Sequence, residues 1–309
     1  MASTFESAGL SAAVDAEMEA IAARWPADVD VRRSIASSYH GLPFAFRAAF
    51  PRVAPSDLVS FAAAARLYAG AILLADPVVD GVGTASVHLF RIMALQSEAL
   101  RALQRLFPPD ARFWGRLQAY TAGYMSACLD ESAFADGRRP WAEYTDACAV
   151  AIALAKNGVA RAVVAGLAEL DGDEAAFERL SSALDDFNFA TQMLDDAQDW
   201  KDDLRRGIPS VLLRPVMADG PRPSDDASLE AFVAQAGRRL YYEGHLVAVL
   251  ERAIDALHRV ERLRDLWPEL TFLRLVAALQ GEIVPLRDDL SRIIDANLAR
   301  GAARATGHA

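Results

Sequence analysis

Cysteine is scarce in this chain, whose 309 residues include only Cys128 and Cys148. Two cysteines cannot build a disulfide framework or a four-cysteine zinc site, so we expect both to be small buried residues. The five histidines show no spacing typical of a metal site. No nucleophile elbow, P-loop or dinucleotide-binding glycine pattern is present either. These absences argue against zinc, P-loop and dinucleotide-dependent enzymes.

Positive charge is also limited. The chain has 32 Lys and Arg against 42 Asp and Glu, a formal net charge of −10, so nucleic acid should be repelled. The N-terminus carries acids where a signal peptide needs a basic start and an apolar run. The apolar stretches at 67–75 and 147–155 are about half of the roughly 20 residues that a membrane-spanning helix needs. We expect a cytoplasmic protein without a nucleic-acid partner or integral membrane association.

Alternating strand patterns are missing, whereas apolar residues recur at spacings of three and four along nearly the whole chain. Hydrophobic residues make up 53% of the chain, enough for a large core. No repeat of fixed period points to a solenoid. We therefore predict an all-α fold, with about ten helices in a single large bundle. Residues 1–309 are expected to form one domain, with 1–27 and 301–309 as mobile termini.

Turn residues indicate where these helices begin and end. The expected starts are Ser56, Thr84, Asp110 and Pro140. The expected ends are Gly158, Gly207 and Gly301. The longest expected loop is 217–228, which is rich in Pro, Asp and Ser.

The most informative segment is FNFATQMLDDAQDWKDDLRRGIPS, residues 187–210. Asp195, Asp199 and Asp203 are four residues apart, so on a helix they form one stripe with steps of about 6 Å. Gln192 lies one turn earlier on the same face. Because like charges at this spacing repel, a compensating cation is expected. Magnesium is typically held by a few carboxylates and substrate phosphates.

A solvated acidic helix face is the alternative interpretation of this aspartate stripe. Two features favour a metal site. Apolar residues precede the aspartates, so the stripe emerges from a buried segment. A second acidic pair, Asp76 and Asp80, ends the apolar helix in RLYAGAILLADPVVDG. There a charged pair is costly unless it meets a partner or an ion. Alone, this second segment would be interpreted as a helix broken at Pro77 and followed by a turn.

Both segments resemble the aspartate motifs of the class I isoprenoid synthase superfamily, which contains trans-prenyltransferases and terpene cyclases. RLYAGAILLADPVVD is similar to the helix that ends in the first motif, QMLDDAQD to the second motif, and LRRGIPSVLL to the loop after it. The resemblance implies a helical bundle around a central apolar cavity, and a homodimer. It also implies that a cluster of three Mg²⁺ ions holds the substrate diphosphate. The implied metal ligands are Asp76, Asp80, Asp195, Asp199 and Asp203.

Lysine occurs only at positions 156 and 201. Lys156 lies 39 residues before Asp195, where prenyltransferases place a diphosphate-binding lysine beside a helix break. Asn157 and Gly158 would supply this break. Lys156 would equally complement the dipole of a helix C-terminus, and the two roles can coexist. The other candidate substrate-binding residues are Arg161, Gln192, Phe187 and Tyr124. The aromatic ones also fit an ordinary core.

The sequence departs from the prenyltransferase pattern in three places. Near the N-terminus no clear GKR-like segment for isopentenyl diphosphate binding is present, and VRRSIASSYHG at 31–41 is only a loose match. Pro77 stands where prenyltransferases have the second aspartate of the first motif, and GVGTASVHLF lacks the paired arginines that follow this motif. A chain-elongating enzyme holds two diphosphates and needs two cationic sites, whereas this sequence indicates one.

We therefore expect a terpene cyclase, a lyase that ionises a C15 or C20 allylic prenyl diphosphate and cyclises the carbocation to a hydrocarbon or an alcohol. The expected catalytic residues are Asp76, Asp80, Asp195, Asp199 and Lys156. One alternative is a prenyl or head-to-head condensing diphosphate synthase, because some of these have a DxxxD first motif. The other is a non-catalytic helical partner subunit whose first motif has decayed.

Overall fold

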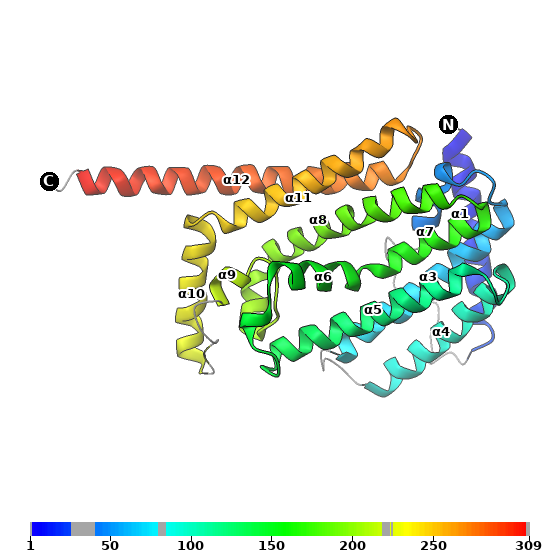
Figure 1. The fold of residues 1–309 in the computed structure, drawn as a ribbon, viewed down its shortest axis with the longest axis horizontal. Helices are drawn as coiled ribbons and strands as arrows, with labels where there is room; N and C mark the ends of the chain where they lie inside the picture. Colours follow the sequence, from blue (N-terminus) through cyan, green and yellow to red (C-terminus); the bar gives the residue numbers. More distant parts are fainter. Residues whose placement is uncertain (1, 26–40, 80–84, 218–222, 224, 307–309) are drawn as a thin grey trace. The chain divides into compact units, whose positions relative to one another are not determined.

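The computed structural model is all-α, as the hydrophobic spacing predicts (Figure 1). It describes residues 2–25, 41–79, 85–217, 223 and 225–306. These residues form twelve α-helices and three short 3-10 helices, and they include no strand. The predicted number of about ten helices is therefore slightly low.

The chain forms two compact units, each assembled from segments that are far apart in the sequence. The first unit contains residues 1–122, 158–182 and 264–272. The second contains residues 123–157, 183–263 and 273–309. Helices α5 (Arg112–Ala135) and α8 (Glu174–Arg206) each contribute residues to both units. That residues 1–309 act as one domain stays a prediction.

Helix α3 (Pro55–Val79) is the core of the first unit. Small side chains allow close packing: Ala62, Ala63 and Ala64 are fully buried. At Gly166 a Cβ atom would lie 2.2 Å from the Phe61 ring, so the approach of these two helices requires glycine. Helix α3 contacts α1 (Ala2–Ala22), α2 (Leu42–Ala45), α4 (Ala85–Leu106) and α7 (Gly158–Asp171). It also contacts α5, through the Phe61–Phe113 ring pair and a hydrogen bond between the Tyr68 and Thr121 hydroxyls. A 3-10 helix, η4 (Arg47–Ala49), follows α2.

The apolar part of α3 spans Pro55–Ala75. It is therefore longer than the apolar stretch at 67–75 that stands out in the sequence. By length and composition it could cross a membrane. However, 56% of its apolar window is buried inside the protein, which is typical of a core helix. The helix also continues through Pro77 to Val79, so Pro77 does not end it.

The second unit is built around the second half of α8, whose buried face includes Met193, Leu194 and Trp200. Helix α10 packs against α9 and α11. The remaining elements are η5 (Trp141–Glu143), α6 (Asp146–Lys156), α9 (Arg214–Met217), α10 (Asp226–Tyr242), α11 (His245–Glu261), η6 (Arg262–Asp265) and α12 (Phe272–Thr306). Of these, η6 extends from the second unit into the first, and α12 begins at the last residue of the first.

Most predicted helix ends lie close to the observed ones. Helix α8 ends before Gly207, whose φ of +74° is the left-handed conformation that glycine favours at a helix end. The prediction that a helix ends at Gly301 was wrong, because α12 continues to Thr306. The alanines around Gly301 are strong helix formers and offset its cost of about 1 kcal/mol. The expected start at Thr84 lies outside the described residues. Residues 2–22 and 301–306 are helical, and the mobility of the two termini stays a prediction.

Candidate active site

The aspartate stripe lies on α8, as its spacing predicts. Asp195 and Asp199 are exposed, and Asp203 is half-buried. Within the described part of the chain, no lysine or arginine forms an ion pair with any of the three. Among the described residues their mutual repulsion therefore has no direct ion-pair partner, and a cation from outside can compensate it.

The pKa values of the stripe reflect burial first and this repulsion second. Burial, followed by the charges of Asp196, Asp195 and Asp199, raises the pKa of Asp203 to about 7. Burial and the charge of Asp199 also raise the pKa of Asp195, whereas Lys156 opposes this shift. A bound divalent cation would favour the ionised form of each carboxylate.

The stripe offers carboxylates to a metal ion on one side only. No group of three or more His, Cys, Asp or Glu side chains among the described residues could hold a metal ion by itself. Magnesium does not require such a group, because it usually keeps several waters and binds one or two carboxylates together with substrate phosphates. Each aspartate of the stripe could therefore supply one carboxylate to a magnesium ion that water and a diphosphate complete, and metal binding by the stripe stays a prediction.

Asp196 has a role that the sequence analysis missed. It is only 2% exposed, and it accepts hydrogen bonds from the Gln192 side chain at 2.8 Å and from the Val211 backbone N–H at 3.1 Å. These bonds tie the loop after α8 back onto the helix. Burial raises the pKa of Asp196 to about 7, although the hydrogen bond from Gln192 lowers it. Gln192, predicted to bind substrate, donates its closest hydrogen bond to Asp196.

Lys156 is the last residue of α6, and α7 begins at Gly158, so the predicted helix break is confirmed. The Lys156 Nζ atom donates a hydrogen bond to the Glu131 carboxylate on α5 at 2.8 Å. Lys156 also lowers the pKa of Asp195, so its charge acts on the aspartate stripe. The structure thus shows Lys156 at the C-terminal end of a helix, as one of its two predicted roles requires. Diphosphate binding by Lys156 stays a prediction.

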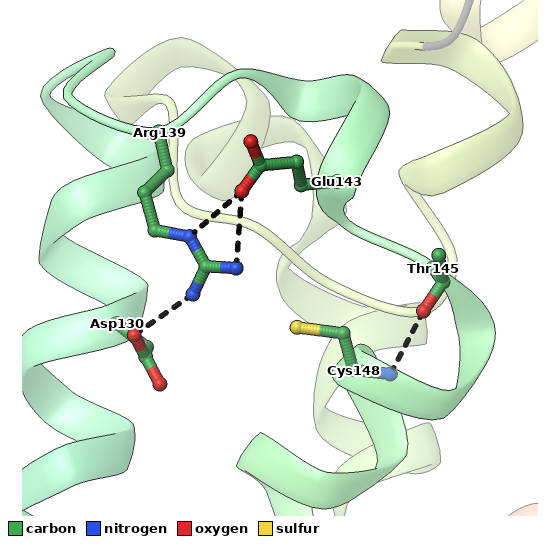
Figure 2. Close-up of polar contacts among 5 residues, drawn as sticks. All are labelled: Asp130, Arg139, Glu143, Thr145 and Cys148. Atoms are coloured by element: carbon green, nitrogen blue, oxygen red, sulfur yellow. Dashed lines mark hydrogen bonds and ion pairs between the residues drawn. The ribbon is translucent and has the colours of Figure 1, made fainter.

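A polar cluster holds the start of α6 (Figure 2). Arg139 pairs with Asp130 of α5 at 2.9 Å and with Glu143 of η5 at 3.2 Å. The Thr145 hydroxyl accepts a hydrogen bond from the Cys148 backbone N–H at 3.2 Å and caps the helix. These contacts fix the helix that carries Lys156. Of the two free cysteines, Cys128 is buried as predicted, and Cys148 is half-buried.

A small polar cavity adjoins Lys156 and Asp196. Its volume of about 20 Å³ has room for roughly one water molecule and is too small for a substrate. Tyr144, which is 3% exposed, also lines it. Burial and the nearby charges of Asp196 and Glu131 raise the pKa of Tyr144, so its hydroxyl stays protonated.

The remaining predicted site residues are distributed over both units. Tyr124 is buried in α5 and Phe187 is half-buried in α8, both within the second unit. Arg161 lies on α7 in the first unit. Asp76 belongs to the last turn of α3, and its side chain, like the whole of Asp80, lies outside the described residues. The first motif therefore stays a prediction.

The comparisons with known proteins give matches only by structure, since no family model and no curated protein matches the chain. A polyprenyl synthase from Caulobacter crescentus CB15, complexed with calcium and isoprenyl diphosphate, aligns with a TM-score of 0.65 at 20% identity. That alignment covers 91% of this chain and 94% of the other. The chain has the fold of the class I isoprenoid synthases.

Two further structures show that this isoprenoid synthase fold extends over nearly the whole chain. A geranylgeranyl pyrophosphate synthase aligns with a TM-score of 0.72 at 14% identity, covering 88% of this chain and 98% of the other. The geranylgeranyl pyrophosphate synthetase from Geoglobus acetivorans gives a TM-score of 0.61 at 17% identity, covering 91% and 98%. The fold that the aspartate motifs predict is therefore confirmed.

The raised pKa of Asp203 predicts a pH-dependent stability in the metal-free protein. The folded pKa of about 7 lies above the ordinary value of 3.8, so the folded state retains the proton that the unfolded state loses between these values. Stability from this group is thus present at low pH and is lost as pH rises through about 7. At pH 8 in EDTA, Asp203→Asn should increase the free energy of unfolding by on the order of 1 kcal/mol, which raises the melting temperature by a few degrees. At pH 4 it should have little effect.

Thermal unfolding of parent and variant across this pH range tests the prediction. Asp202→Asn is the matched control, because Asp202 is exposed and pairs with Arg205 at 3.1 Å. It should give no stabilisation at pH 8. A melting temperature for Asp203→Asn equal to that of the parent at both pH values would contradict the prediction.

Proposed function

We propose that this protein is an enzyme that ionises an allylic prenyl diphosphate and joins it to a second isoprenoid diphosphate. The aspartate stripe on α8 carries the proposal, because it offers carboxylates to a metal-bound diphosphate. The structural matches support condensation over cyclisation, since those proteins are polyprenyl and geranylgeranyl pyrophosphate synthases. The Caulobacter synthase binds calcium and isoprenyl diphosphate, which supports a divalent metal and a diphosphate substrate here. The cytoplasmic homodimer expected from the sequence is part of this proposal.

The residues of the second unit have separate roles in this proposal. Asp195, Asp199 and Asp203 would hold magnesium. When bound, magnesium supplies positive charge that stabilises the departing diphosphate. Lys156 adds a fixed cation that already acts electrostatically on Asp195. Asp196 fixes the loop after α8 and, through Gln192, the helix turn that carries the stripe. The charge that develops on the leaving group would therefore meet preorganised cations.

Cyclisation of a single C15 or C20 diphosphate is the second candidate. The observation that favours it is the lack of paired arginines after the first motif, together with Lys156 as the lysine whose charge acts on Asp195 of the stripe. A condensing enzyme must bind a second diphosphate, and this sequence shows no clear second cationic site for it.

Product analysis separates the two candidates. The purified protein is incubated with Mg²⁺ and geranyl, farnesyl or geranylgeranyl diphosphate, with and without isopentenyl diphosphate. We expect a longer prenyl diphosphate only when isopentenyl diphosphate is present, and no product in EDTA. A hydrocarbon or an alcohol formed from one allylic diphosphate alone would establish cyclisation instead.

A binding measurement addresses the non-catalytic alternative. Pyrophosphate with Mg²⁺ should stabilise the folded protein by about 2.7 kcal/mol at a hundredfold excess over its dissociation constant. If there is neither stabilisation nor turnover, the protein is a non-catalytic helical subunit.

A further inference from the structure

A groove of about 400 Å³ lies in the second unit between α8, α10 and α12. Its α8 residues include Lys201 and Arg205, which the helical repeat places on a different face from the aspartate stripe. The groove volume falls within the range of about 300–1,000 Å³ that is usual for small-molecule sites. It is therefore a separate candidate for ligand binding.

The floor and walls of the groove are apolar and aromatic. Tyr242 and Ile293 line it and are 50% and 53% exposed. The Trp200 ring lies 6.4 Å from that of Tyr241, edge to face. A Cβ atom at Gly237 would lie 3.0 Å from Trp200, so the glycine allows this ring to pack against α10. Large apolar side chains left open to solvent in a concave site are typical of a binding surface.

The charged residues of the groove are mainly cationic. Lys201, Arg205 and Arg238 line it against one acid, Glu230, a local balance of 3 − 1 = +2 in a chain of net charge −10. Glu230 is already engaged by Arg205 at 2.9 Å. The Lys201 ammonium lies 5.5 Å from the Trp200 ring centroid. No carboxylate in the described part of the chain forms an ion pair with Lys201 or Arg238.

We propose that this groove binds a soluble single-chain amphiphile with a phosphate head group. Lys201 and Arg238 attract the phosphate, and the hydrocarbon chain covers the surface formed by Trp200, Tyr242 and Ile293. Both parts of the ligand are needed, because an exposed cation pair alone holds an anion weakly, whereas each buried methylene adds binding energy. The site is independent of the aspartate stripe and does not rest on the proposed function.

Binding of n-alkyl phosphates tests this proposal. Octyl, decyl and dodecyl phosphate are titrated below their micellar concentrations into the full-length protein in EDTA, and binding is followed by calorimetry. Each added methylene should tighten binding by up to about fourfold, which is the equivalent of about 0.8 kcal/mol. Dodecyltrimethylammonium, with the same chain and the opposite charge, should bind at least tenfold more weakly than dodecyl phosphate.

Two kinds of variant locate the site. Lys201→Glu combined with Arg238→Glu should weaken dodecyl phosphate binding by at least tenfold. Ala234→Trp, at an exposed lining position, should fill the groove and abolish binding without disturbing the core. Arg274→Glu is the matched control on an exposed part of α12 and should bind like the parent. Equal affinity of the parent and the double variant would overturn the proposal.

Two further measurements distinguish a soluble ligand from a membrane surface and the groove from the proposed active site. Binding to phosphatidylglycerol vesicles, without binding to monomeric dodecyl phosphate, would overturn a soluble ligand in favour of a membrane surface. Binding in EDTA excludes a metal-dependent site at the aspartate stripe, and Asp199→Asn should leave it unchanged. If dodecyl phosphate binds only with Mg²⁺ and this binding is lost in Asp199→Asn, the probe occupies the proposed active site and the groove proposal fails. Turnover by the same variant reports on the proposed function separately.

Discussion

Replacing Asp195 or Asp199 by asparagine should reduce turnover of an allylic diphosphate by about 10²–10³-fold or more. Asparagine keeps the size of the side chain but removes the charge that a magnesium ion requires. Both residues are exposed on α8, and the one hydrogen bond described for them is that from Gln192 to Asp195 at 3.5 Å, so neither variant should destabilise the fold. Because each variant removes one of the repelling charges, the free energy of unfolding in EDTA at neutral pH should stay the same or rise slightly. Loss of activity without loss of stability would identify the stripe as a functional feature.

Steady-state turnover at saturating Mg²⁺, with thermal unfolding of the same samples, measures this effect. Asp202→Asn is a control on the same helix, because the Asp202 side chain is 77% exposed and pairs with Arg205. It should retain the activity of the parent. Parental turnover in both Asp195→Asn and Asp199→Asn would mean that the stripe is only a solvated acidic face.

The aspartate stripe could be predicted from the sequence because its geometry is local. Once 187–206 is helical, a spacing of four residues places Asp195, Asp199 and Asp203 on one face whatever surrounds the helix. The end of α8 at Gly207 was predictable for the same reason, since a glycine at a helix end needs only its own backbone conformation. The all-α class follows from the same local periodicity.

The role of Asp196 could not be predicted in this way. It is buried because the chain returns to it 15 residues later, at Val211, and nothing in the pattern around position 196 encodes that return. The pairing of Lys156 with Glu131 joins residues 25 positions apart on two helices and is likewise a tertiary contact. Periodicity identifies the face of a helix, whereas burial and ion pairing depend on which other segments pack there.

Lys156→Gln should reduce turnover by about 10²-fold, because it removes the cation that acts on the stripe and is proposed to stabilise the leaving diphosphate. If Lys156 had only a structural role, Lys156→Gln would not alter the pH dependence of turnover. If its charge acts on the stripe, this pH dependence should change. Lys156 lowers the pKa of Asp195, so its removal raises that pKa. If Asp195 must be ionised for activity, the acidic limb of the rate profile should move to higher pH in Lys156→Gln.

Two other variants separate the charge of Lys156 from its contact with Glu131. Glu131→Gln removes the ion pair but leaves the cation, so it should retain most of the activity, and Lys156→Arg should restore part of what Lys156→Gln loses. Lys201→Gln removes the only other lysine, on a different face of α8, and should leave turnover unchanged. If Glu131→Gln and Lys156→Gln were equally inactive with the same pH profile, the lysine would act by holding Glu131 and not through its charge at the stripe.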